Sequence, residues 1–245
     1  MTNEPRIEEQ ALSQAAEIGI SSQLDDAEEI SVDVRTDLLK MVQGQADSVS
    51  FAGQGLVMQK DIRVQEIELQ LDGVAINPLS ALLGKLELDR PVDASARLIM
   101  TEQDINRALN SDYIRSQMQS IELDVQGQTV SLEMQQMELL LPEDGKMVFN
   151  AKTRLHEIGG TRQVSFSSAF RPRTSSQPVL LQKFDCTEGE GISLELTLAL
   201  MKKINEWVHL PYLELDKMAF RVEEMEVHPG TITLRAEAHV TQLPS

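Results

Sequence analysis

The sequence predicts an α+β fold: a strongly curved antiparallel sheet, or open barrel, wrapped around or packed on two to three amphipathic helices. Segments with apolar residues at every second position are spread along the 245 residues, which is typical of half-buried strands. Two of these segments change phase within their length, which indicates β-bulges that bend a sheet. Apolar residues at helical spacing occur in only a few segments between the strands.

The chain is expected to consist of an acidic N-terminal segment, residues 1–26, and a single domain, residues 27–245. Within the first segment, apolar residues at helical spacing predict an amphipathic helix over Ile7–Leu24. We expect this helix to dock on the sheet or to bind a partner. Its many acids indicate a solvated face rather than one that lies on a membrane. No linker rich in Pro, Gly or Ser divides the remaining residues, which favours one domain.

The sheet is expected to begin near residue 30. Residues 30–35 alternate between apolar and polar, and Leu38–Val42 form a short helical turn that a glycine closes. The glycines at 53 and 55 indicate a turn that joins two strands. In the next strand the inward phase slips between Val64 and Ile67, which predicts a β-bulge.

The most informative stretch is Val92–Ser111, where a strand leads into a helix. Residues 92–100 alternate, and Thr101 is a natural N-cap. Asp104 lies where the acid of a capping box reaches back to the N–H of the cap, and the helix dipole favours its charge there. The apolar residues that follow share one face of the helix, which is expected to fold back onto the sheet. Another short helix is expected over residues 77–84, since Asn-Pro opens it and a glycine ends it.

The second half of the chain alternates in the same way. A second phase slip lies between Met134 and Met137 and predicts another bulge. Residues 171–178 look like a loose connector. Residues 194–210 begin with the alternation of a strand and are expected to become helical near Leu200. Further strands are expected at 121–125, 130–141, 147–155, 164–170, 218–227 and 231–241, the last two joined at Pro229-Gly230.

Charge and composition restrict the class of partner. A net charge of −17 argues against nucleic acid, which needs clustered Lys and Arg, and against purely electrostatic adhesion to an anionic membrane. No apolar run approaches the length that spans a bilayer, and the polar, acidic start is unlike a signal peptide. We therefore expect a cytoplasmic protein, or one that associates peripherally with a membrane. The single cysteine, Cys186, cannot form an internal disulfide.

Motifs for catalysis, metals and cofactors are missing from the sequence. The four histidines have no partners at metal-binding spacing, and there is no G-x-S-x-G elbow. The Gly-x-Gly pairs at residues 53 and 189 lack the third glycine of a dinucleotide-binding loop, so they are better explained as turns. Adjacent acids lie on polar stretches and are best explained as solvated surface. The sequence thus predicts no enzyme activity, no cofactor and no metal site.

Several motifs resemble the LmeA-like phospholipid-binding family, a group of bacterial proteins. They are the T-E-x-D-I-N-x-A-L helix that starts at Thr101, Asn77-Pro78 followed by leucines and Gly-Lys, the early V-x-V strand with two leucines and a second strand, and the late LPYLELDKM. The resemblance runs from about Ile30 to the C-terminus. It implies a tubular, lipid-binding cavity with a long helix on a curved sheet. Exported members carry an N-terminal signal or anchor that the start of this sequence does not show.

The leading hypothesis is non-catalytic binding, transfer or sensing of a phospholipid or similar apolar ligand in a cavity between sheet and helices. The lipid role depends on the resemblance, because alternation alone is equally compatible with a solid core. The eleven methionines suit either a core or an adaptable ligand wall. The expected lining residues are Leu98, Met100, Ile105, Leu109, Leu132, Met134, Trp207 and Leu234.

A basic stretch between Lys146 and Lys183 contains seven Lys or Arg residues. One interpretation is that these charges balance the acidic surface. The other is a local site for an anionic headgroup, since arginine forks match phosphate, with Arg171, Arg173 and Arg162 as the contacts.

The alternative hypothesis is a protein–protein interaction module with a filled core that docks through its acidic N-terminal helix. The expected partners are therefore a lipid or other apolar small molecule, a membrane in transient contact, or a protein. An enzyme ranks third, because it would need a site that sequence spacing does not show.

Overall fold

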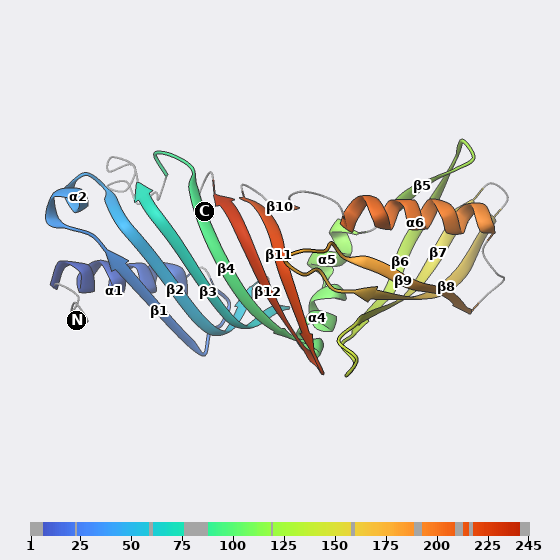
Figure 1. Cartoon of the computed structure of the whole chain (residues 1–245), viewed down its shortest axis with the longest axis horizontal. Coiled ribbons are helices and arrows are strands. Elements are labelled where there is room, and N and C mark those ends of the chain that lie inside the picture. Colours follow the sequence, from blue (N-terminus) through green and yellow to red (C-terminus); the bar gives the residue numbers. More distant parts are fainter. Residues whose placement is uncertain are drawn as a thin grey trace.

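A computed structural model describes residues 7–22, 24–58, 61–75, 88–118, 120–157, 160–188, 193–208, 213–215 and 218–240. These residues form two antiparallel sheets, one larger and curled, together with five helices (Figure 1). The predicted α+β class with a curved antiparallel sheet is confirmed. The strands belong to two sheets, which Figure 1 places side by side along the long axis of the molecule.

The larger sheet has seven strands from both ends of the chain. The chain leaves this sheet after β4 and returns for the last three strands, so that β12 pairs with β4. In order across the sheet, the strands are β1 (Glu29–Arg35), β2 (Gln45–Met58), β3 (Ile62–Ala75), β4 (Val92–Thr101), β12 (Thr231–Val240), β11 (Met218–His228) and β10 (Leu213–Leu215).

The smaller sheet is a five-stranded meander that the chain forms between β4 and β10. Helix α6 (Leu194–Val208) packs on it through Leu196 and Leu200, and together they bury one of two aliphatic cores. The strands, in sheet order, are β5 (Ile121–Val125), β6 (Gln128–Leu140), β7 (Met147–Glu157), β8 (Gly160–Arg171) and β9 (Leu180–Glu188).

The second core lies under α1 (Ile7–Ser21), which confirms the predicted N-terminal helix. Leu12, Ala16 and Ile20 share one face of α1 and pack on a cluster of buried residues from β1 and β2, which includes Val32 and Phe51. Short helix α2 (Leu38–Val42) joins β1 to β2 as expected.

The strand and the capped helix form as predicted, but the carboxylate of Asp104 bonds the Thr101 hydroxyl and not its backbone N–H. Helix α4 (Glu102–Leu109) begins after Thr101, whose hydroxyl oxygen accepts from the N–H of Asp104 at 3.0 Å. The carboxylate of Asp104 is 4% exposed and accepts from the Thr101 hydroxyl at 2.7 Å and from Arg63 at 3.0 Å. Asp104 is therefore a buried link to β3 as well as a first-turn acid. A second helix, α5 (Asp112–Gln117), follows the N-cap Ser111 and was not predicted.

Two helices form hydrogen bonds with the backbone at the edge of a strand. The side chains that form them are spaced four residues apart on each helix. On α1, Glu17, Ser13 and Glu9 accept from the backbone N–H of Val32, Val34 and Thr36 at 3.0, 3.1 and 3.1 Å. Glu102 and Asn106 of α4 and its C-cap Asn110 accept from the backbone N–H of Leu141, Leu139 and Met137 at 2.6, 2.7 and 3.4 Å. Four helical residues rise about 6.0 Å, and two strand residues span about 6.6 Å, so the two spacings match.

The interpretation of residues 53–55 as a turn is wrong. Gly53 and Gly55 lie inside β2, and the chain reverses between Met58 and Ile62. No register shift occurs between Val64 and Ile67, so the first predicted bulge is absent. Gly55 has φ +60° inside the strand, a conformation that glycine adopts readily.

The second predicted bulge is confirmed, because the register of β6 against β7 shifts between Met134 and Gln136. Residues 171–178, expected to be a loose connector, are fixed by backbone hydrogen bonds. Thr174 and Gln177 exchange backbone hydrogen bonds of 2.9 and 3.3 Å, and the carbonyl of Arg173 accepts from the N–H of Met225 at 2.9 Å. The expected helix at residues 77–84 lies outside the described residues.

Residues 194–208 are helical throughout, so the expected strand-like start is wrong. Leucines at 194, 196, 198 and 200 alternate like a strand, but pairs four apart also share a helical face. Leu196 and Leu200 pack on the smaller sheet, while Leu194 and Leu198 are exposed on the other side. Because this helix is apolar on two faces, its leucines recur at every second position, as they would in a strand. Strand β9 was also not predicted.

Candidate functional site

The larger sheet has one apolar face, which begins in the core under α1 and continues across the central strands. Residues directly opposite in an antiparallel pair share a face. Ile67 and Leu69 pack against the α1 core, and they lie opposite Leu98 and Ala96 on β4. Leu234 and Ala236 on β12 lie opposite the same two β4 residues. All four residues on β4 and β12 are half-buried, so the face remains partly open there.

Three of the predicted lining residues lie together on this face. Leu98 and Leu234 are directly paired, and Met100 is paired with the buried Ile232 next to them. Ile105 and Leu109 are half-buried on α4, which packs against β3, β4 and β6 at the junction of the two sheets. Ala96 and Ala236 form the next pair on this face beside Leu98 and Leu234, and we call this row of small and large aliphatic side chains the aliphatic bed.

The other predicted lining residues lie in the smaller sheet. Leu132 is 2% exposed inside the core under α6, and Met134 packs against that core. Trp207 lies near the end of α6, and its side chain is outside the described part of the structure. The structure therefore divides the predicted lining between two places, and Leu132 belongs to a filled core.

The predicted headgroup residues are also divided. Arg162 and Arg171 lie near opposite ends of β8, about 30 Å apart at about 3.3 Å per residue. Arg173 lies beside Met225 of β11, which is paired with Leu234. Arg171 and Arg173 therefore lie near the outer edge of the apolar face, and Arg162 does not. The guanidinium of Arg171 donates to Gln177 and, at 3.2 Å, to the carbonyl of Pro178, while its buried Nε has no hydrogen-bond partner among the described residues.

Several members of the basic stretch are paired with acids. Lys146 lies 2.6 Å from Asp144, Lys183 lies 2.5 Å from Asp185, and Arg154 lies 3.3 Å from Glu133. His156 also bonds Glu133, at 3.2 Å, and this hydrogen bond is the main cause that lowers the pKa of the Glu133 carboxyl. Charge balance accounts for this part of the stretch.

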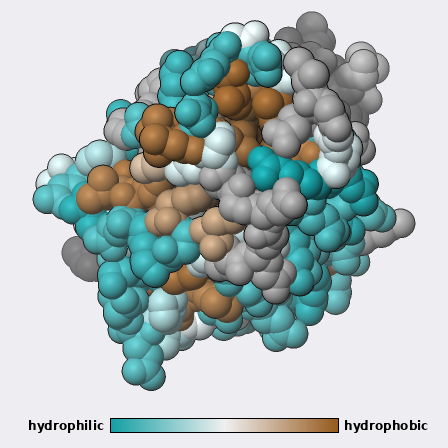
Figure 2. All heavy atoms as spheres, turned by 90° about the vertical axis from the view of Figure 1, so that its right-hand side faces the viewer, coloured by the Kyte–Doolittle hydropathy of each residue, from teal (hydrophilic) through white to brown (hydrophobic). Residues whose placement is uncertain are grey.

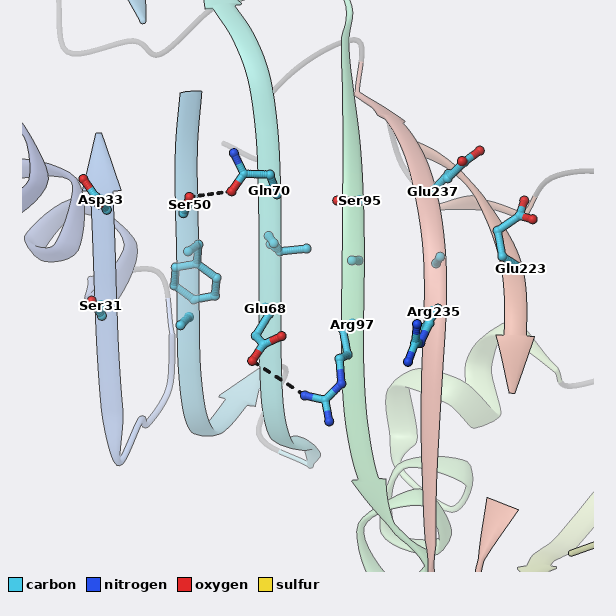
Figure 3. A pocket seen from close by; sticks show the side chains of 15 residues that line it. Ser31, Asp33, Ser50, Glu68, Gln70, Ser95, Arg97, Glu223, Arg235 and Glu237 are labelled. Carbon is cyan, nitrogen blue, oxygen red and sulfur yellow. Dashed lines mark hydrogen bonds and ion pairs between the residues drawn. The ribbon is translucent and has the colours of Figure 1, made fainter. Parts of the chain in front are cut away.

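The opposite face of the larger sheet is polar and hollowed, a feature that the analysis of apolar positions missed. A trough of about 670 Å³ lies across β1, β2, β3, β4, β12 and β11 (Figure 3). Arg97 and Arg235 lie directly opposite each other in it. Arg97 is 3.6 Å from Glu68, and Arg235 is 3.6 Å from Glu226. The lining of the trough combines serines and charged side chains with apolar residues of the same strands, among them Phe51, Leu69, Ala96 and Ala236.

A second apolar surface lies on the outer side of α6. Leu194, Leu198 and Met201 share one helical face and are exposed there. Figure 2 views the molecule from this end and shows hydrophobic side chains grouped among hydrophilic ones. None of the described helices is both long and apolar enough to cross a membrane. The described residues also contain no group of three or more His, Cys, Asp or Glu side chains suited to a metal ion.

Comparison with known proteins identifies the family. A search of curated proteins finds no significant match. The LmeA-like phospholipid-binding family matches residues 5–237, nearly the whole chain, which includes α1 ahead of the motifs that suggested the resemblance. The family is described by phospholipid binding. The chain belongs to the LmeA-like phospholipid-binding family.

Proposed function

We propose that this protein binds phospholipid, or a similar apolar ligand, without catalysis, and that the acyl chains lie on the apolar face of the larger sheet. The observation that carries the proposal is that this face continues from the α1 core across β3, β4 and β12 as half-buried aliphatic surface. Leu98, Met100 and Leu234 would form the floor, and Ile105 and Leu109 of α4 would close one end.

Burial of acyl chains on such a surface would offset much of the cost of association. Each buried methylene contributes about 0.8 kcal/mol. About ten methylenes would therefore contribute about 8 kcal/mol, which is within the range of the ordering costs of association. Reversible binding of this kind suits transfer or sensing of lipid during transient membrane contact.

The headgroup would lie at the edge of the same face, near Arg171 and Arg173. Arg173 neighbours Met225, and Met225, Leu234 and Leu98 follow one another across β11, β12 and β4. Guanidinium groups at this edge match a phosphate. Arg162 is too far along β8 to contact the same headgroup.

Native mass spectrometry after incubation with phospholipid vesicles tests the proposal. Ala96 and Ala236 lie opposite each other on the apolar face, and the double substitution Ala96→Phe with Ala236→Phe should fill the bed and abolish lipid binding. The matched control is Ala52→Phe, which should retain lipid, because Ala52 lies opposite Glu68 and therefore on the other face of the sheet from Leu69 and Ala96. A protein that stays free of lipid, or a double variant that still binds it with unchanged affinity, would contradict the proposal.

A second candidate is a protein-interaction module that docks through α1. The observation that favours it is the outer face of α1, where Ile7 and Ile18 are highly exposed. Deleting residues 1–26 would also remove the side chains that complete the edge of β1, so substitution of Ile18 is the cleaner test. Loss of a protein partner with retained lipid binding would support this candidate.

A further inference from the structure

The trough on the polar face of the larger sheet contains an exception to the charge pattern of that sheet. In four places among its described strand pairs, an acid lies directly opposite a base: Glu68–Arg97, Glu224–Arg235, Glu237–Arg221 and Asp93–His239. In one place, inside the trough, two bases lie directly opposite each other, Arg97 of β4 and Arg235 of β12 (Figure 3). Like charges in directly opposite positions destabilise a sheet, so a bound anion would relieve this pair.

Both guanidinium groups of this pair have donors available. The side chains of Arg97 and Arg235 are 38% and 56% exposed. Their nearest described carboxylates, those of Glu68 and Glu226, lie at 3.6 Å, which is too far for a hydrogen bond. By contrast, the guanidinium of Arg63 on neighbouring β3 donates to two carboxylates at 2.6 and 3.0 Å. Each guanidinium carries five N–H donors in a fork that matches phosphate oxygens.

The acids around the arginine pair make a bare anion a poor ligand. Apart from the arginine pair, the charged residues that line the trough are Asp33, Glu68, Glu223 and Glu237. Further carboxylates of Glu66, Glu224 and Glu226 lie within 4.0 Å of the two guanidinium groups. This excess of negative charge repels a phosphate that carries no other group and attracts an ammonium group attached to a phosphate.

The spacing of the charges fits a ligand that carries both groups. Glu68 lies directly opposite Arg97 on the next strand and also lines the trough. Neighbouring strands are about 4.8 Å apart, a distance that a two-carbon link between a phosphate and an amine can span. Glu224 lies opposite Arg235 on the other side of the pair, but it does not line the trough. The volume of about 670 Å³ is enough for a small ligand.

We propose that the trough binds a zwitterionic phosphoamine of the phosphoethanolamine type. Its phosphate would lie between Arg97 and Arg235, and its ammonium group would donate to the carboxylate of Glu68. This chemistry occurs in small soluble molecules and in the headgroup of phosphatidylethanolamine. Leu98 and Leu234 of the aliphatic bed point to the other face of the sheet, because successive residues of a strand alternate. The trough site is therefore independent of the proposed acyl site.

Isothermal titration calorimetry of the full chain with phosphoethanolamine tests the proposal. Phosphoethanolamine should bind at least about tenfold more tightly than inorganic phosphate or ethanolamine, because each of these lacks one of the two charged contacts. Arg97→Gln and Arg235→Gln should each weaken binding at least about tenfold, through loss of charge-assisted hydrogen bonds. The matched control is Arg35→Gln on β1, which should leave the affinity unchanged. Arg35 is equally exposed, at 39%, and is paired with Asp33 at 2.8 Å.

Glu68→Gln tests which group recognises the ammonium. This variant should weaken the binding of phosphoethanolamine and should not weaken the binding of inorganic phosphate, a change of preference that a general loss of structure would not produce. The proposal is overturned if phosphoethanolamine does not bind at millimolar concentration or if Arg97→Gln leaves its affinity unchanged. It is also overturned if inorganic phosphate binds as tightly as phosphoethanolamine, which would indicate a simple anion site.

Co-sedimentation with vesicles distinguishes the two sources of the ligand. Vesicles of phosphatidylcholine with phosphatidylethanolamine are compared with vesicles of phosphatidylcholine alone. Binding that requires phosphatidylethanolamine and is lost in Arg97→Gln would identify a membrane lipid as the source. Binding of free phosphoethanolamine without such vesicle binding would identify a soluble phosphoamine. Retention of phospholipid by Arg97→Gln in native mass spectrometry would show that the acyl site is separate.

Discussion

At the scale of single residues, Asn106 shows how a polar side chain joins the two sheets. Its amide nitrogen donates to the carbonyl of Leu139 at 2.8 Å, and its amide oxygen accepts from the N–H of the same residue at 2.7 Å. A helix side chain thus replaces the neighbouring strand that this part of β6 lacks. Asn110 makes the equivalent pair of bonds with Met137, at 2.8 and 3.4 Å.

Replacing Asn106 by Ala should lower the free energy of unfolding by about 1–3 kcal/mol, because two backbone groups of Leu139 lose their partner in a half-buried site. Asn106→Asp should also destabilise, because it keeps the acceptor and loses the donor. Urea denaturation would measure both. The comparison variant is Gln103→Ala at an exposed position of the same helix, for which we expect a change within about 0.5 kcal/mol. Equal effects at the two positions would contradict the paired-backbone role.

The carboxyl of Glu133 provides a pH prediction. Its pKa lies below the ordinary value of 4.5, first because His156 bonds it and further because Arg154 is near. The ionised form therefore contributes stability above pH 4.5, and this contribution is lost as pH falls through the lowered pKa. His156→Ala should raise the pKa of Glu133 towards 4.5, as measured by ¹³C NMR titration. An unchanged pKa would mean that Arg154 alone sets it.

At this scale, hydrogen bonds between residues close in the sequence could be predicted, and those between residues far apart in the sequence could not. The N-cap role of Thr101 was predicted, since the cap and its acceptor are three residues apart. The partner of Asp104 was not, because Arg63 lies on another strand, 41 positions earlier in the sequence. The roles of Asn106 and Asn110 likewise depend on β6, which follows later in the chain.

At the scale of elements, α6 shows why periodicity alone misassigned a helix. Four alternating leucines fit a strand, yet two of them face the core of the smaller sheet and two face outward. Sequence does not reveal whether both faces of a segment are covered. The same limit explains why Gly55 was interpreted as part of a turn, because its positive φ within β2 is a property of the folded strand.

The two faces of α6 should respond differently to the same substitution. Leu196 is 3% exposed, so Leu196→Ala should lower the free energy of unfolding by about 2–5 kcal/mol through loss of buried surface and a residual cavity. Leu198 is 58% exposed, so Leu198→Ala should change it by less than about 0.5 kcal/mol. Thermal or urea unfolding measures both. Similar losses at the two positions would place Leu198 in an interface.

At the scale of the whole molecule, the predicted lining residues fall into two groups. Leu98, Met100 and Leu234 do share one face, because they lie on strands whose alternation is clear. Leu132 and Met134 alternate equally well, but they belong to the other sheet and its core. Alternation shows that a residue faces inward and does not show into which of two cores. The polar trough was not predicted, because most of its residues occupy the solvent-facing positions of the same strands.

The junction between the sheets decides whether the chain unfolds as the single domain expected for residues 27–245. The two cores are separate, and the smaller sheet is inserted between β4 and β10. They are coupled through the α4 side chains on β6 and through Gly230, whose N–H donates to Leu141 at 3.0 Å and whose carbonyl accepts from Glu102 at 2.8 Å. Chain connectivity alone would permit the two sheets to unfold independently. We therefore expect these hydrogen bonds to make the two sheets unfold together.

We expect the wild-type protein to unfold in one calorimetric transition, because hydrogen bonds from α4 and Gly230 tie residues 137–141 to the larger sheet. Replacing Asn106 and Asn110 together by Ala should separate it into two transitions. Amide exchange would identify them, since Leu155 reports the smaller core and Val34 the larger. Equal exchange free energies in the wild type and unequal ones in the double variant would establish coupling through α4. Two transitions already in the wild type would instead mean that the sheets are separate folding units, with the lipid-binding face in one of them.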